Sequence, residues 1–250
     1  MKLYDTTQEQ PEQIPDTAPQ IPEPKTFFYR FKNWWYYHKW HVICGIILAW
    51  ILIDVVGGAL GLWAKKPDFQ IAYVGSAILP DDTVSSLEQA FAELAGDFNQ
   101  DGEVIVQVNQ YIISSDTSDY ETASYSYSSE VLLMGDISSC DSYFFLTDDP
   151  GYLQRGFQIL ADPDGSCPDE TDDSVDDKVV CWTDCSVLAG MDLGSYTAVI
   201  SGSEVTGDNQ ELLSGLYLGR RYFYSDKTVD SLSQCDTLWN TIISTNPHVE

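Results

Sequence analysis

One acidic segment carries the side chains best suited to bind a metal ion. Oxygen-bearing side chains occupy alternate positions, and a glycine, Gly102, is the sixth residue of the segment. This spacing is typical of loops that wrap a hard cation such as Ca²⁺. The candidate ligands are Asp97, Asn99, Asp101 and Glu103.

Two features of this segment differ from an EF-hand. The twelfth position holds Val108 where an EF-hand has glutamate, and residues 104–108 have the β-branched composition of a strand rather than a helix. The alternative is an Asx-rich turn in which Gly102 adopts a left-handed conformation. The sequence therefore leaves open a calcium loop and a simple turn, and Ca²⁺ is the only cofactor that it suggests.

The cysteines offer a second kind of chemistry. Cys44 lies in an apolar run, and five more cysteines follow it. A disulfide from Cys167 to Cys181 or to Cys185 would close an acidic segment, provided that the compartment is oxidising. Cys181 and Cys185 could also form half of a zinc site, but no second pair is spaced to complete it.

Support for catalysis is weak. After residue 67 the only histidine is His248, so a serine or cysteine nucleophile has no evident base. Acid pairs such as Asp81/Asp82, Asp148/Asp149 and Asp172/Asp173 leave a carboxylate-dependent hydrolase as an alternative. In so acidic a chain most such pairs belong to the surface, and we expect no catalytic activity.

The charges are divided unevenly along the 250 residues. Of the 39 acidic and 12 basic residues, 33 acidic and 5 basic ones follow Lys66. A net charge of −27 argues against nucleic acid as a partner, because phosphates need a cationic surface. The jump in charge at Lys66 marks a boundary between compartments or domains.

An apolar run, residues 42–63, precedes this boundary and contains a single charge. At about 1.5 Å per residue it spans about 33 Å, enough to cross a bilayer core. Residues 25–41 before it combine nine aromatic side chains with four cations, as expected at a cytoplasmic membrane surface. We expect a single-pass protein of type II topology in the cell membrane, with an extracytoplasmic C-terminal domain. A cleaved signal peptide is the alternative.

Within this span, Asp54 lies near the bilayer centre, where a carboxylate must be protonated or paired. Gly57 and Gly61 follow on the same helical face as a small-residue packing signal. Together they predict association with a membrane-protein partner or with a second copy. The alternative is a monomeric anchor that contacts only the lipid bilayer.

The chain outside the membrane divides into a tail and a folded domain. Residues 1–24 contain five prolines and few apolar side chains, which predicts a disordered cytoplasmic tail. Residues 67–250 alternate strand and helix patterns, which predicts an α/β domain with a mostly parallel or mixed sheet and flanking helices. We expect strands at 69–74, 104–113, 143–146, 179–182 and 196–200, and helices at 82–95, 130–135 and 230–244.

The remaining stretches are less regular. Residues 114–129 are expected to be a polar loop and residues 161–178 an acidic, solvated insertion, whereas residues 212–223 fit a helix or a strand equally well. Asp81 or Asp82 is expected to cap the helix at 82–95.

Two resemblances follow from these segments. The WWYYHKWH stretch leading into an acidic domain resembles uncharacterised single-pass proteins of Gram-positive bacteria. The order of elements from Phe69 to Leu146 is similar to the first lobe of type-II periplasmic solute-binding proteins, over about eighty residues and without a ligand motif. The second resemblance implies a fold more than a function.

The sequence thus predicts a membrane-anchored accessory or adaptor protein of the cell envelope that binds without catalysis. The first alternative is a tethered module for a solute or sugar, for which an aromatic-lined cleft would be required. Its candidate aromatic residues are Tyr120, Tyr125, Tyr127, Trp182 and Trp239.

Overall fold

The computed structural model describes residues 27–59, 65–114, 119–169, 172–200 and 202–244. It separates into two units, Met1–Ala64 and Lys65–Glu250. The predicted tail, residues 1–24, lies outside the described residues, as do residues 60–63 at the end of the predicted span.

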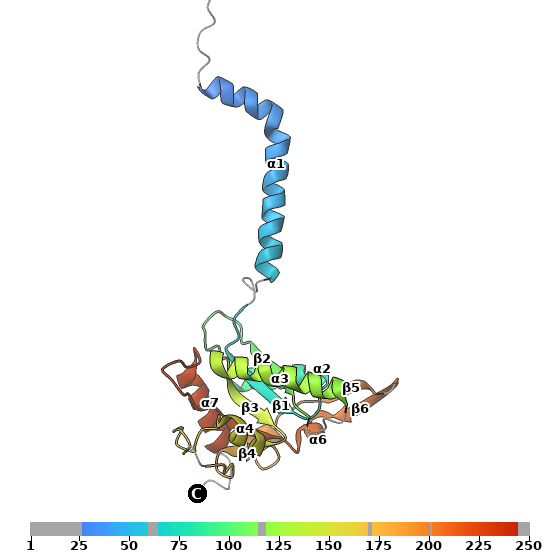
Figure 1. Ribbon diagram of the computed structural model, residues 1–250, viewed down its shortest axis with the longest axis vertical. Helices are drawn as coiled ribbons and strands as arrows, with labels where there is room; N and C mark the ends of the chain where they lie inside the picture. The colour runs from blue at the N-terminus through green and yellow to red at the C-terminus, as the bar shows by residue number, and fades with distance from the viewer. Residues whose placement is uncertain (1–26, 60–64, 115–118, 170–171, 201, 245–250) are drawn as a thin grey trace, which may run out of the picture. The chain divides into compact units, whose positions relative to one another are not determined.

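The first unit contains one long helix, α1 (Phe27–Ala59). The aromatic stretch and the apolar run, predicted separately, form this one helix of 33 residues (Figure 1). The helix is long and apolar enough to cross a membrane, and only 6% of its most apolar stretch is buried inside the protein.

The second unit is an α/β domain built on a mixed sheet, in the order β2-β1-β3-β7-β4. Its strands are β1 (Phe69–Gly75), β2 (Val106–Ile112), β3 (Ser142–Thr147), β4 (Val179–Cys181) and β7 (Tyr217–Arg220). The strands β1, β2 and β3 are parallel, whereas β7 runs antiparallel to both β3 and β4. The predicted α/β class and the mixed sheet with flanking helices are confirmed.

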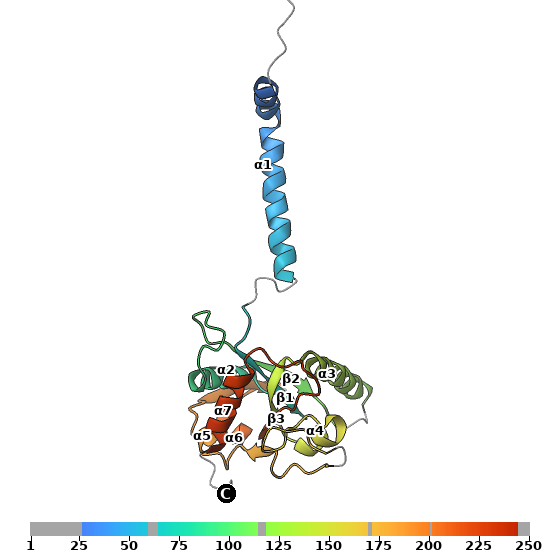
Figure 2. The same cartoon turned by 90° about the vertical axis from the view of Figure 1, so that its left-hand side faces the viewer.

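Helices cover both faces of this sheet (Figure 2). The helices α2 (Asp81–Leu94), α5 (Ser186–Ala189), α6 (Asn209–Leu213) and α7 (Leu232–Ser244) share one core, and α3 (Tyr120–Ser139) and α4 (Pro150–Phe157) share the other. Alternate strand residues supply each core: Phe144 points to the first and Phe145 to the second, and both are fully buried. A strand buried on both faces has a continuous run of apolar residues, and this pattern predicted the strand at Tyr143–Leu146.

The helix α3 corrects the sequence prediction. It spans 20 residues, whereas a polar loop at 114–129 and a short helix at 130–135 were expected. Asp119 caps it by accepting a hydrogen bond from the backbone N–H of Thr122 at 3.1 Å. The buried face of α3 contains the small polar residues Ser126 and Ser129. The sequence therefore lacks the apolar periodicity that would have predicted a helix here.

Other boundaries also differ from expectation. Pro80, rather than Asp81 or Asp82, stands at the N-cap of α2, and Asp82 instead accepts a hydrogen bond from the backbone N–H of Thr197. The ambiguous stretch 212–223 divides between the end of α6 and strand β7. The strands β5 (Ser195–Ile200) and β6 (Ser203–Asp208) form a separate antiparallel hairpin. The sequence predicted the first of these strands and not the second.

Because the chain divides into two units, we expect the α/β domain to fold without α1. A fragment spanning residues 67–250 is expected to melt in one cooperative transition, because both cores lie within it. Calorimetry of the purified fragment measures this directly. A broad transition without a cooperative peak would contradict the boundary.

Candidate functional site

The carboxyl ends of β1 and β3 form the most favourable place for a ligand in this fold. The chain leaves β1 for β2 on one side and returns across β1 to β3 on the other. Ligands of open α/β sheets bind at such a switch point, outside the carboxyl ends of the strands. Ser76 directly follows β1, and Asp148 and Asp149 directly follow β3.

Hydrogen bonds link these two loops. Both the backbone N–H and the hydroxyl of Ser76 donate to Oδ2 of Asp148, at 2.8 and 2.6 Å. Asp149 accepts a hydrogen bond from the backbone N–H of Tyr152 at 2.9 Å and thereby caps α4. A cavity of about 370 Å³ lies against these residues.

A larger cleft of about 770 Å³ shares Asp148 and Asp149 and runs along the edge strand β4. Its remaining acidic residues are Asp176, Asp177 and Asp184, and Tyr217 and Trp239 supply aromatic surface. The residues lining the cleft include no lysine or arginine. Five carboxylates without a counter-charge in the lining attract cations and repel anions, so the cleft suits a positively charged or hydroxyl-bearing ligand.

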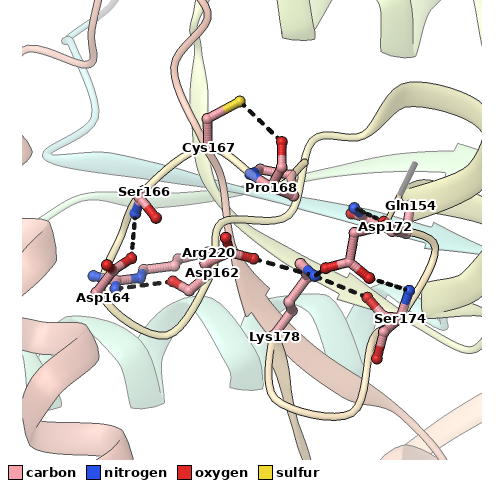
Figure 3. A network of polar contacts seen from close by, with 10 residues as sticks. All are labelled: Gln154, Asp162, Asp164, Ser166, Cys167, Pro168, Asp172, Ser174, Lys178 and Arg220. Atoms are coloured by element: carbon pink, nitrogen blue, oxygen red, sulfur yellow. Dashed lines mark hydrogen bonds and ion pairs between the residues drawn. The ribbon is translucent and has the colours of Figure 1, made fainter. Parts of the chain in front are cut away.

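Two buried cations, Lys178 and Arg220, bind the loops of the acidic insertion (Figure 3). Nζ of Lys178 donates to Asp172 at 2.6 Å and forms an ion pair with Asp162 at 3.2 Å, while its side chain is only 4% exposed. Burial alone would lower the pKa of Lys178, but its bonds to Asp172 and Asp162 raise it. The Lys178 hydrogen bond likewise lowers the pKa of Asp172. The described part of 161–178 forms no helix or strand, as predicted, and Lys178 ties its two ends together. Gln154 of α4 donates to the carbonyl oxygen of Asp172 at 2.9 Å and attaches the insertion to the domain.

Arg220 attaches the insertion to strand β7. It donates to the carbonyl oxygen of Pro163 at 2.6 Å, and its guanidinium lies 5.8 Å from the ring centroid of Trp239. Sequence reasoning missed Lys178 and Arg220 as structural residues. Only five basic residues follow Lys66, and this scarcity of cations in an acidic domain could have indicated that each one neutralises carboxylates or carbonyl groups.

The predicted calcium loop is a tight turn in the structure. Asp97 accepts hydrogen bonds from the backbone N–H groups of Asp101 and Gly102, and Asn99 accepts one from Asp101. Gly102 has φ of +90°, the left-handed conformation expected for it. Glu103 pairs with Lys65 at 2.5 Å. Within the described residues no group of three or more acidic, histidine or cysteine side chains is arranged to hold a metal ion. Calcium binding remains a prediction.

Calcium binding by this loop has a direct test. If the loop binds Ca²⁺, adding a chelator should lower the melting temperature of fragment 67–250 by several degrees, because the ion binds only the folded state. The same chelator should leave the melting temperature of an Asp101→Ala variant unchanged. Identical melting curves of the unsubstituted fragment with and without chelator would exclude the site.

All six cysteines belong to the described residues, and all are free thiols. Cys167 is exposed and donates to the carbonyl oxygen of Pro168, whereas Cys185 is fully buried and donates to that of Ile242. Cys181 contacts the hydroxyl of Thr183. The structure does not join Cys167 to Cys181 or Cys185, and a disulfide among them remains a prediction.

The residues predicted for helix association lie in or near α1. Asp54 is exposed on the helix, Gly57 follows one turn later, and Gly61 lies outside the described residues. Their proposed contact with another membrane helix stays a prediction.

The aromatic candidates do not form a common platform. Trp182 is fully buried and donates through Nε1 to Gln210 at 2.7 Å. Trp239 is buried in the first core, although it also lines the larger cleft. The three tyrosines, Tyr120, Tyr125 and Tyr127, are exposed on α3 rather than in a loop.

Comparison with protein-family models found no match to this chain, and neither did comparisons with curated proteins and with solved structures. The resemblances to single-pass proteins of Gram-positive bacteria and to a solute-binding lobe therefore remain sequence-based interpretations.

Proposed function

We propose that this chain is a membrane-anchored accessory protein of the cell envelope that binds a partner without catalysis. One observation carries the proposal: α1 is an exposed apolar helix, separate from a domain that already has two complete cores. A helix that finds no place in the protein core requires another apolar environment, and a bilayer supplies it.

The orientation follows from charge. Arg30, Lys32 and Lys39 lie before the apolar part of α1, and the strongly acidic domain lies after it. Because cationic flanks stay on the cytoplasmic side, the N-terminus is cytoplasmic and the α/β domain is extracytoplasmic.

The partner is a membrane protein or a second copy that contacts the face of α1 bearing Asp54 and Gly57. Gly61, predicted for the same contact, lies outside the described residues. A carboxyl group facing lipid costs about 2.5–3.5 kcal/mol on insertion scales, whereas a partner helix can accept its hydrogen bond. Small residues on the same face allow close approach of that helix.

This contact predicts a result for crosslinking in the native membrane. Replacing Asp54 by leucine should reduce the crosslinked species several-fold, since the polar contact is removed while the helix still spans. Val56→Leu, on the opposite side of α1, should leave crosslinking unchanged. Mass spectrometry of the captured species identifies the partner, and equal crosslinking by Asp54→Leu would contradict the contact.

A second candidate function is a tethered module that binds a small cationic or hydroxyl-bearing solute. The acidic cleft at the carboxyl ends of β1 and β3 favours it. Capture of no partner in the crosslinking experiment would favour this candidate. The carboxylate-dependent hydrolase is supported less well, because Asp148 and Asp149 are engaged by Ser76 and by the start of α4.

A further inference from the structure

The helix α1 is longer than a membrane span requires. A helix of 33 residues extends about 50 Å, whereas the hydrocarbon core is about 30 Å thick. Residues 42–59 alone cover about 27 Å. About 20 Å of the helix therefore lies outside the hydrocarbon core, and residues 27–41, which carry three cations and no acidic side chain, are the part suited to lie there.

A continuous stripe of rings runs along one side of this part. Phe27 lies 6.3 Å from Phe31, Phe31 lies 6.0 Å from Trp34, and Trp34 stacks on His38 at 5.2 Å, measured between ring centroids. Trp35 lies 6.3 Å from Phe31. The spacing i, i+4, i+7, i+8, i+11 places all five rings on a single helical face.

This stripe is not covered by the described part of the protein. Phe27 is 75% exposed and Phe31 is 50% exposed. A straight helix projecting into the cytoplasm would leave these rings in water. Lying along the bilayer surface would bury them below the headgroups.

The cations are placed to meet lipid headgroups. At 100° per residue, Lys32 and Lys39 lie on one flank of the stripe and Arg30 on the other. Their long side chains can reach phosphate groups while the rings point toward the acyl chains. This charge favours anionic lipid over zwitterionic lipid.

The helix also has the bend that such an arrangement requires. Figure 1 shows the first turns of α1, in the darkest blue, running across the direction of the rest, and Figure 2 shows the same turns end-on. Nδ1–H of His38 donates to the carbonyl oxygen of Trp34 at 2.9 Å, which fixes the imidazole ring against the ring of Trp34.

We propose that residues 27–38 form an amphipathic helix in the interface of the cytoplasmic leaflet and bind anionic phospholipid through the ring stripe and its flanking cations. This inference rests on the proposed function, because it requires α1 to be anchored in the membrane. It adds a lipid-binding surface to what would otherwise be a simple anchor.

Photo-crosslinking of the full-length chain tests the inference. The chain is reconstituted into phosphatidylcholine vesicles containing 30% phosphatidylglycerol, with p-benzoylphenylalanine replacing one residue at a time. Phe31 and Trp35 report on the stripe, and Tyr29 and Tyr36 are matched aromatic controls on the opposite face. Ile47 reports on the span. Lipid adducts are quantified by mass spectrometry.

We expect abundant lipid adducts at positions 31, 35 and 47, and at least fivefold fewer at positions 29 and 36. A triple variant with Arg30, Lys32 and Lys39 replaced by glutamine should lose most adducts at position 31 and keep those at position 47. Adducts at 47 with equal yields at 31 and 36 would overturn the interfacial helix alone. Protein adducts in place of lipid adducts at 31 would also overturn it. An absence of lipid adducts at 47 would overturn the membrane anchor itself, and the interfacial helix with it.

Discussion

Replacing Asp68 by alanine is expected to lower the free energy of unfolding of the α/β domain by about 3 kcal/mol. Asp68 is 4% exposed and stands directly before β1. Its carboxylate accepts three backbone hydrogen bonds, from Phe98 at 2.7 Å, Asn99 at 3.0 Å and Ile105 at 2.7 Å. These bonds tie the segment between α2 and β2 to the start of the sheet. Alanine would leave three partly buried donors without an acceptor, and each such donor costs about 1–3 kcal/mol, less where water reaches it.

Urea unfolding of fragment 67–250, followed by tryptophan fluorescence, measures this loss. Asp97→Ala is the matched control, because Asp97 also accepts backbone hydrogen bonds but in an exposed turn. The control should cost less than about 1 kcal/mol. If both variants lost the same stability, the bonds to Asp68 would not hold the segment.

The domain is also expected to lose stability steeply above pH 10. Burial, helped by the charge of Asp148, raises the pKa of Tyr73 to about 12. Burial also raises the pKa of Tyr111, together with the neighbouring Asp136, and that of Tyr143, together with its hydrogen bond to Asp236. In the unfolded chain these phenols ionise near pH 10.

The sign follows from proton binding. Between pH 10 and 12 the folded state keeps protons that the unfolded state has released, so stability falls as pH rises. Each tyrosine contributes up to about 1.4 kcal/mol per pH unit in this window. The burial that raises the pKa of Cys235 to about 12 adds to the loss from about pH 9 upward.

Urea unfolding at pH 8, 10 and 11 measures the slope of stability against pH. Tyr143→Phe should reduce this slope, because one titrating group is removed, even though its hydrogen bond to Asp236 is also lost. Tyr127→Phe, at a position that is 70% exposed, should leave the slope unchanged. A flat profile from pH 8 to 11 would show that these phenols are hydrated in the folded state.

The strands β1 and β3 could be predicted because most of their side chains are apolar on both faces. β1 and β3 appear in the sequence as short apolar runs, and α7 shows the i, i+3, i+4, i+7 spacing of an amphipathic helix. α3 could not be predicted in full, because it buries serines and Asp136 while Val131 and Leu132 face solvent. Asp136 is satisfied there by the hydroxyls of Tyr111 and Ser142, partners that only the tertiary fold supplies.

The candidate site was predictable only in its parts. Asp148 and Asp149 were noted as an acid pair, and their place after a strand is visible in the sequence. The cleft also needs Asp176, Asp177 and Asp184, which come from the insertion and from the turn after β4. The position of the insertion depends on Arg220 and Gln154, whose contacts with Pro163 and Asp172 leave no local pattern in the sequence.

The central claim is that α1 anchors the chain with its acidic domain outside the cell, and sidedness tests it most directly. Epitope tags are placed before Met1 and after Glu250, and each tag is detected by antibody in intact and in permeabilised cells. The account predicts that the C-terminal tag is labelled in intact cells and that the N-terminal tag is labelled only after permeabilisation. Labelling of the N-terminal tag in intact cells, or of the C-terminal tag only after permeabilisation, would contradict it.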